Sequence, residues 1–510
     1  MSNLGRTLIR NSLSGAVAYG VDLAVNLLLA PYLLSTLGAK LFGIWIVLVV
    51  ATNYFSLFDL GVSTGFIKHL TEAETHQRVN QRNTIVATGW VFYVLFSLLI
   101  IGIGATAGSW LLRFLKIDPA FTTVYWGVLL VFGIRNSSVV YRSLLFARQR
   151  VDILNAIAVV GAMIRAIGTV AALALGYGLA GLVTVSIGMA LFHVTMEVLM
   201  AYRVYDRLQL RPLAASFSTF QTLFQYGIRV QTSRFADLVY LHIDKLLLSH
   251  FVGFGAVTFY ELGGKVAGLT RSFPTILLQG LLPAAAELEA QRNRAKLLRL
   301  YVKSSKYLVA LAFPLAAFSI LEARQIIQVW LGAGDHGATT LALQVLTIAY
   351  LFHLLMEVAL AVARGIGVVQ FEMRALLVTA VLNLVLSLLL IVQYGLTGAL
   401  IGTTVSMIIG YVLFMQPFHR HVAFSFGDLV KEVYLVPFAG AVVASGAVAA
   451  VGYSFGWLEP SVDAPRLVGL LSLSIKGLLF VVLYGAMVWK RGYIAVSDMH
   501  LLRRTVLSSS

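Results

Sequence analysis

The sequence of 510 residues contains no cysteine and few charged residues. The absence of cysteine excludes disulfide bonds, thiolate metal sites and a cysteine nucleophile. Charged residues make up 12% of the chain, whereas a soluble domain usually carries about 25%. Because 59% of the residues are hydrophobic and the mean hydropathy is +0.87, we predict an all-α polytopic membrane protein.

Acidic residues are scarce as well, since 22 Asp and Glu stand against 38 Lys and Arg. The resulting net charge of +16 does not indicate a nucleic-acid partner, because no soluble basic module is present to bind one. The sequence also lacks a P-loop, so an ATPase is not expected. Residues 332–337 match G-x-G-x-x-G, but they follow a membrane segment rather than a strand, and nucleotide binding is rejected.

Long hydrophobic runs, in contrast, occur from one end of the chain to the other. About 14 of them are long enough to cross a bilayer as helices. They fall near residues 11–34, 41–67, 84–108, 121–141, 152–175, 179–201, 220–248, 254–281, 305–322, 340–363, 372–392, 396–416, 432–453 and 466–488.

The distribution of Lys and Arg predicts the topology. If the N-terminus is cytoplasmic, about 25 basic residues fall in cytoplasmic segments and about five on the opposite side, as the positive-inside rule requires. The predicted cytoplasmic segments are 1–10, 68–83, 142–151, 202–219, 282–304, 364–371, 417–431 and the C-terminal tail. Both termini are therefore predicted to be cytoplasmic.

An internal repeat divides the chain. Tyr177-Gly178-Leu179-Ala180-Gly181-Leu182 returns 217 residues later as Tyr394-Gly395-Leu396-Thr397-Gly398-Ala399. We predict two six-helix repeats that form N and C lobes around a central cavity, followed by an extra pair of helices. The expected divisions are 1–205, 206–418 and 419–510.

One predicted helix, residues 219–250, carries a polar stripe at steps of three or four residues. Its members are Thr222, Tyr226, Arg229, Ser233, Asp237, Tyr240 and Asp244. A weaker stripe on the first helix contains Asn11, Gly15, Asp22 and Asn26. Charges at membrane depth must face protein or water, so the first stripe is predicted to line a hydrated central cavity.

Several motifs resemble the polysaccharide-transporter branch (Wzx-type O-antigen and exopolysaccharide flippases) of the multidrug/oligosaccharidyl-lipid/polysaccharide exporter superfamily. They are Leu37-Gly38 with Phe42-Gly43-Ile44-Trp45, Tyr54-Phe55-Ser56-Leu57-Phe58-Asp59-Leu60-Gly61, Leu282-Pro283, Arg364-Gly365 and the repeated Tyr394-Gly395 motif. The resemblance implies a bacterial inner-membrane flippase that moves a polyprenyl-diphosphate-linked oligosaccharide by alternating access. A polysaccharide polymerase and a chain-length regulator are the implied protein partners, in addition to the lipid bilayer.

A diphosphate is best bound by arginine, whose planar guanidinium can bond two oxygens at once. The candidate substrate-binding residues are Arg229, Arg234, Arg135, Arg165 and Lys265. The alternative is that these charges form ion pairs within the membrane, as the four-residue spacing of Glu261 and Lys265 suggests.

Ion coupling would need a buried carboxylate that exchanges H⁺ or Na⁺, and no other cofactor is expected. The candidates are Asp22, Asp237, Asp59, Glu197 and Glu357, of which Asp59 is expected to be mainly structural. His193 and His353 each precede a candidate glutamate by four residues, but two ligands on a helix do not make a metal site.

Other functions remain open from the sequence. A lipid-linked peptidoglycan-precursor flippase and a multidrug/cation antiporter are alternatives within the same superfamily. A membrane glycan polymerase or ligase is the alternative enzyme, but the predicted extracytoplasmic loops are short and carry few charged residues. A scaffold that transports nothing is a further alternative. We therefore expect a transporter rather than an enzyme.

Overall fold

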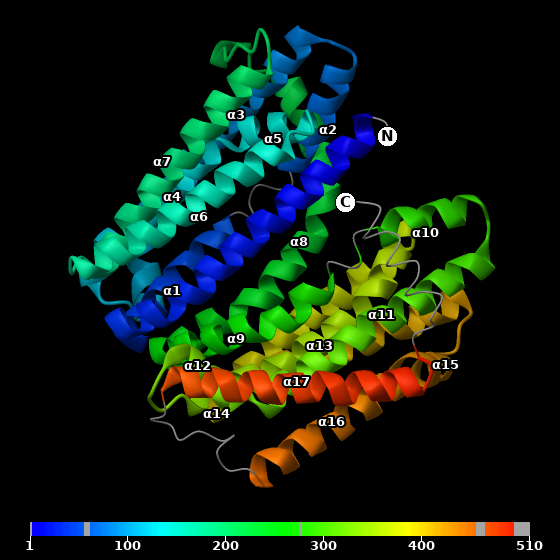
Figure 1. Cartoon of the computed structure of the whole chain (residues 1–510). Helices are drawn as coiled ribbons and strands as arrows, with labels where there is room; N and C mark the ends of the chain where they lie inside the picture. Colours follow the sequence, from blue (N-terminus) through cyan, green and yellow to red (C-terminus); the bar gives the residue numbers. More distant parts are fainter. Residues whose placement is uncertain (1–2, 56–61, 276–277, 279, 455–464, 494–510) are drawn as a thin grey trace. The chain divides into compact units, whose positions relative to one another are not determined.

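The computed structural model describes residues 3–55, 62–275, 278, 280–454 and 465–493, without the side chains of 3–9, 53, 55, 64, 226 and 228–241. Within these ranges the regular structure is entirely helical (Figure 1). The helices form two compact units, residues 1–258 and 259–510. The predicted all-α polytopic class is confirmed.

The first unit contains eight helices and the first residues of a ninth within the described part of the chain. They are α1 (Asn3–Phe55), α2 (Val62–Thr75), α3 (Val79–Phe114), α4 (Thr122–Ser137), α5 (Val139–Ala147), α6 (Val151–Ala174), α7 (Gly178–Val204), α8 (Phe217–Phe251) and the start of α9 (Phe254–Thr275). α1 packs on α6, α6 on α7 and α7 on α4, while α8 packs on α2 (Figure 1). Phe66, Tyr93, Leu144 and Leu223 meet in a core where each is at most 1% exposed.

The second unit contains the rest of α9 and the later helices. They are α10 (Leu281–Ala290), α11 (Arg294–Leu321), α12 (Ala323–Leu331), α13 (Gly337–Gly365), α14 (Gln370–Val422), α15 (Phe426–Leu429), α16 (Leu435–Ser454) and α17 (Arg466–Lys490). α13 packs on α11 and α14 around the buried Tyr301, Phe414 and Phe418. The predicted extra pair, α16 and α17, packs against α11, with Phe480 edge-on to Phe318.

Ten described helical stretches are long and apolar enough to cross a membrane. One of them, in α14, contains two predicted segments, and the one in α1 contains the segment 11–34 and the first part of 41–67, whose last residues belong to α2. A straight 53-residue helix would be about 80 Å long, more than twice the hydrocarbon thickness. The backbone instead turns at Gly38 and Gly395, which have φ values of 72° and 58°. The two remaining predicted segments, 220–248 and 254–281, correspond to α8 and α9.

The repeated sequence motif corresponds to a repeated hairpin geometry. Gly178 and Gly395, which are 217 residues apart, both adopt positive φ, 52° and 58°, a region that favours glycine. A Cβ atom on Gly181 would lie 2.9 Å from the Cβ of Ala172, and one on Gly398 would collide with the backbone at Leu390. In each copy the first glycine turns the chain and the second allows two helices to pack closely.

The packing units and the sequence repeats divide the chain differently. α8 packs with the first unit, whereas the repeat places it at the start of the second copy. The divisions at 205/206 and 418/419 concern the repeats and remain a prediction.

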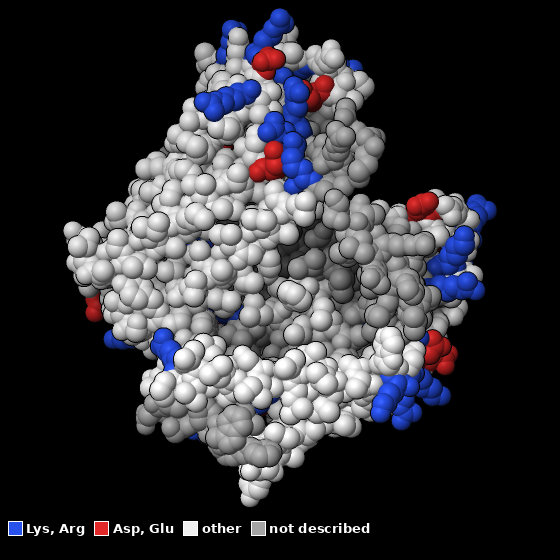
Figure 2. All heavy atoms as spheres, in the orientation of Figure 1, with Lys and Arg blue, Asp and Glu red and all other residues white. Residues whose placement is uncertain are grey.

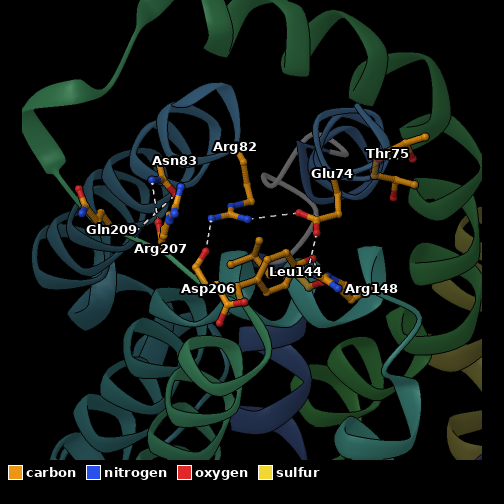
Figure 3. A network of polar contacts seen from close by, with 11 residues as sticks. Glu74, Thr75, Arg82, Asn83, Leu144, Arg148, Asp206, Arg207 and Gln209 are labelled. Atoms are coloured by element: carbon orange, nitrogen blue, oxygen red, sulfur yellow. Dashed lines mark hydrogen bonds and ion pairs between the residues drawn. The ribbon is translucent and has the colours of Figure 1, made fainter. Parts of the chain in front are cut away.

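A network of polar contacts connects three segments at one end of the first unit (Figure 3). Glu74 binds Arg82 at 3.3 Å and Arg148 at 2.7 Å, and Arg82 Nη2 donates to the carbonyl oxygen of Asp206 at 2.9 Å. These residues come from three segments that the charge pattern assigns to the same side of the membrane, so the structure agrees with that alternation. On the visible face of this unit, charged groups gather near the helix ends and leave a mostly uncharged middle (Figure 2).

Two predicted cytoplasmic loops are largely helical. α5 continues through Ala147, and the segment 282–304 forms most of α10 and the start of α11. Lys and Arg are good helix formers, and their long side chains can reach water from a helix end, so basic composition alone does not indicate a loop. Arg142, which was predicted to lie in a loop, is therefore on a helix.

Candidate functional site

Four of the ten predicted site residues lack a described side chain. Arg229, Arg234 and Asp237 belong to α8, and their side chains lie outside the described residues, as does Asp59 altogether. Their roles remain predictions. The other six lie on described helices, and each has an acidic or basic partner nearby.

Arg135, Arg142 and Glu197 form what we call the arginine cluster. α4 and α5 carry the two arginines seven residues apart, so both point towards α7, which carries Glu197. Arg142 Nε lies 3.4 Å from Glu197 Oε1, and Arg135 Nη1 lies 4.0 Å from the same oxygen. One carboxylate oxygen thus holds two guanidinium groups from different helices.

The arginine cluster has unused hydrogen-bonding capacity. The Glu197 side chain is 4% exposed, whereas those of Arg135 and Arg142 are 34% and 35% exposed. Glu197 Oε2, Arg135 Nη1 and Arg142 Nε are buried without a hydrogen-bond partner among the described residues, as is the neighbouring Asn136 Nδ2. With two cations for one anion, the cluster has surplus positive charge and free donors on helices that are apolar enough to cross a membrane, which suits an anionic group.

His193 on α7 makes a hydrogen bond within its own helix and packs against α6. Its Nδ1 lies 2.8 Å from the carbonyl oxygen of Met189, so Nδ1 carries the proton and donates. The imidazole packs against α6 at Gly161, where a Cβ would come within 2.5 Å of the ring. The glycine is needed for this close approach, and the histidine holds the two helices together.

A second polar pair joins α1 and α6. Arg165 Nη2 donates to Asp22 Oδ1 at 2.6 Å, and Asn26 Nδ2 donates to Asp22 Oδ2 at 3.0 Å. One helix turn or more away, Asn155 donates to Ser14 at 2.9 Å, and Asn11 donates to the Gln149 carbonyl at 2.9 Å. The weaker polar stripe predicted on the first helix is therefore a seam against α6.

In the first unit, the arginine cluster and the pair of Asp22 with Arg165 each join a residue predicted to bind substrate to one predicted to couple an ion. Arg135 and Arg165 were predicted to bind substrate, and their partners Glu197 and Asp22 were predicted to couple an ion. Sequence spacing could not show this, because Asp22 and Arg165 are 143 residues apart.

The second unit holds two local pairs. Lys265 Nζ lies 3.1 Å from Glu261 Oε1, so the ion pair suggested by their spacing is confirmed. His353 Nδ1 lies 3.3 Å from Glu357 Oε1 on α13. Both pairs are at i and i+4 of one helix, which sequence alone can indicate.

The described end of the α8 stripe is buried in protein. Asp244 is 0% and Lys245 9% exposed, and the apolar Leu248 beside them is 0% exposed. This agrees with the expectation that charges on this helix turn away from lipid.

Neither the role of Arg142 nor the pair of Lys476 with Glu322 was predicted from the sequence. Lys476 Nζ lies 2.9 Å from Glu322 Oε2 and 3.0 Å from Gln325 Oε1, and both charged residues are less than 10% exposed. A lysine inside the hydrophobic segment 466–488 was the available signal, because such a charge needs a partner.

Comparison with known proteins identifies the family. The family model for a polysaccharide biosynthesis protein matches residues 37–337, more than half of the chain. The chain belongs to this family. Over 81% of its length, this family member is 21% identical to a protein of Shigella flexneri named "Putative O-antigen transporter", of which it covers 98%. The predicted resemblance to polysaccharide transporters is thereby confirmed.

Solved structures share the fold of this family member at low sequence identity. The inward closed conformation of the lipid II flippase MurJ matches with a TM-score of 0.70 and 13% identity, over 94% of this chain and 99% of that one. An inward-facing multidrug resistance MATE transporter of the MOP superfamily matches with a TM-score of 0.65 and 14% identity, over 83% of this chain and 99% of its own.

Proposed function

We propose that this protein moves a polyprenyl-diphosphate-linked oligosaccharide, such as an O-antigen, capsule or exopolysaccharide repeat unit, from the cytoplasmic to the outer leaflet. The observation that carries the proposal is the surplus positive charge of the arginine cluster within membrane helices. A charged group on a membrane helix is costly unless it has a partner. Guanidinium donors without a hydrogen-bond partner therefore favour an anionic ligand. The name of the Shigella flexneri relative supports a glycan substrate.

In this proposal Arg135 and Arg142 bind the diphosphate, and Glu197 keeps them in place while the site is empty. Arrival of the diphosphate would compete with Glu197 for the same guanidinium groups. Releasing the carboxylate would favour its protonation or its binding of Na⁺, because a buried carboxylate without a cation is unstable. Substrate binding and ion binding would then be linked at one residue, as coupled alternating access requires.

The remaining predicted residues keep their proposed roles. Arg229 and Arg234 are proposed to extend the cationic path, and Asp237 to act as a second coupling carboxylate. The bacterial inner membrane, cytoplasmic termini, and a polymerase and chain-length regulator as partners also belong to the proposal.

A lipid-linked peptidoglycan precursor is the second candidate substrate. It is favoured by the MurJ match, which extends over 94% of this chain, whereas the MATE match extends over 83%. A cationic drug is disfavoured, since two guanidinium groups around one carboxylate repel a cation.

The test is a flipping assay with purified protein in vesicles that carry a polyprenyl-diphosphate oligosaccharide. Arg135→Gln and Arg142→Gln should each slow glycan exposure at least about tenfold, because a hydrogen bond to a charged group contributes about 1.5–3 kcal/mol. Arg203→Gln is the matched control, since Arg203 is an exposed arginine in the last turn of α7. If both cluster variants transport like Arg203→Gln, the proposed site is wrong. If the wild type moves only peptidoglycan precursors, the second candidate replaces the first.

A further inference from the structure

A cavity of about 540 Å³ lies in the second unit, where α14 ends and α15 begins. The helix ends at Val422, Ala423 adopts a left-handed conformation with φ of 47°, and α15 starts at Phe426. The stretches on either side, Gln370–Val422 and Phe426–Ser454, are both apolar enough to cross the membrane. The cavity is therefore at the level where the hydrocarbon of the bilayer gives way to its headgroups.

The wall of the cavity is mainly apolar and partly open. Val412 and Met415 contribute from α14, and Phe424 and Phe426 from the turn and α15. Val412 is 51% exposed and Phe426 43% exposed, so apolar surface in the cavity is open to a ligand. A flexible hydrocarbon chain suits such a surface.

Some polar side chains that line the cavity already have hydrogen-bond partners in the protein, and others are free to bind a ligand. His419 is fully engaged: Nδ1 donates to the Phe424 carbonyl at 2.9 Å, and Nε2 lies 2.9 Å from the Tyr301 hydroxyl, from which it accepts. This histidine fixes the turn rather than binding a ligand. Gln416 and Arg420, in contrast, are exposed on the same helix and have no side-chain bond to another described residue.

Arg420 gives the cavity its charge. It is the charged member among the described lining residues, and it lies in the last turn of α14. A second cation is close in the structure, because Arg294 Nη2 donates to the carbonyl oxygen of the adjacent His421 at 2.9 Å. Asp428 and Glu432 on the following helical turns are exposed and do not line the cavity. The combination is an apolar wall with one guanidinium at headgroup level.

We propose that this cavity binds an anionic phospholipid of the surrounding bilayer, with its phosphate on Arg420 and one acyl chain against Val412, Met415, Phe424 and Phe426. Basic pockets at the ends of membrane helices are suited to acidic headgroups. A phospholipid has both features that the cavity requires and is always present at this depth. The cavity is lined by residues of the second unit and shares none with the arginine cluster, so it does not depend on the proposed substrate.

The experiment is native mass spectrometry of the purified full-length protein with phosphatidylglycerol or phosphatidylcholine added. The wild type should retain phosphatidylglycerol in preference to phosphatidylcholine, and Arg420→Gln should weaken its binding about tenfold, since a charge-assisted hydrogen bond is lost. Val412→Trp should weaken binding with the charge intact by filling the cavity. Arg203→Gln, which removes an exposed last-turn arginine from a helix that does not line the cavity, should leave binding unchanged.

Three outcomes would overturn the proposal. Equal binding of phosphatidylglycerol by the wild type, Arg420→Gln and Val412→Trp would show that the lipid binds elsewhere. Equal retention of phosphatidylcholine would show an apolar groove without headgroup recognition. Displacement of phosphatidylglycerol by inorganic phosphate alone would show a simple anion site that needs no acyl chain.

Discussion

The buried pair of Lys476 and Glu322 allows a direct test of how the last helix is held. Lys476 on α17 is 4% exposed and Glu322, between α11 and α12, is 7% exposed. Lys476→Met removes the ammonium but fits a similar volume, so it leaves an unpaired carboxylate beside Gln325 in the protein interior. Removing one partner of a buried pair typically costs about 3–5 kcal/mol.

The double variant separates this charge effect from simple loss of packing. In Lys476→Met with Glu322→Gln, neither member of this pair is charged any longer, and most of the lost stability should return. The measurement is thermal unfolding in detergent, followed by size-exclusion chromatography. Lys490→Met is the control, because Lys490 is an exposed lysine at the end of the same helix. If Lys476→Met unfolds at the wild-type temperature, or if the double variant is no more stable than the single one, the pair does not stabilise the last helix.

The remaining predictions concern a turn, the end of the first unit and ion coupling. Gly395→Ala should lower the unfolding temperature, because alanine is strained by about 1 kcal/mol or more at φ 58°, and an unchanged melting curve would contradict this. Arg82→Met removes the contacts of the Arg82 side chain with Glu74 and with the Asp206 carbonyl, so the segment that follows α7 should become more susceptible to limited proteolysis. Wild-type resistance would show that these contacts do not hold that segment. Asp22→Asn and Asp237→Asn, separately and together, should change the pH or Na⁺ dependence of flipping in vesicles, and an unchanged dependence would exclude them from coupling.

The predicted membrane helices were recovered because each depends on neighbouring residues. A hydrophobic run of about 20 residues fixes a spanning helix whatever it packs against. The turns at Gly178 and Gly395 are equally local, since a positive φ is set by the backbone of one residue. The pairing of Glu261 with Lys265 also follows from spacing on one helix.

Ion-pair partners on different helices could not be predicted from the spacing of residues in the sequence. Arg142 looked like one of many basic residues at the end of a predicted segment, and its contact with Glu197 depends on how α5 packs on α7. Lys476 and Glu322 are 154 residues apart, and Asp22 and Arg165 are 143 apart.

Hydropathy therefore determined which segments of this protein are long and apolar enough to cross a membrane, because the bilayer acts on each segment separately. Only the tertiary structure decided which charges meet, which of them keep unused hydrogen-bonding atoms, and where a cavity forms. Those properties arise from packing between distant segments, and a charge in a low-dielectric interior is stable only beside the partner that packing provides.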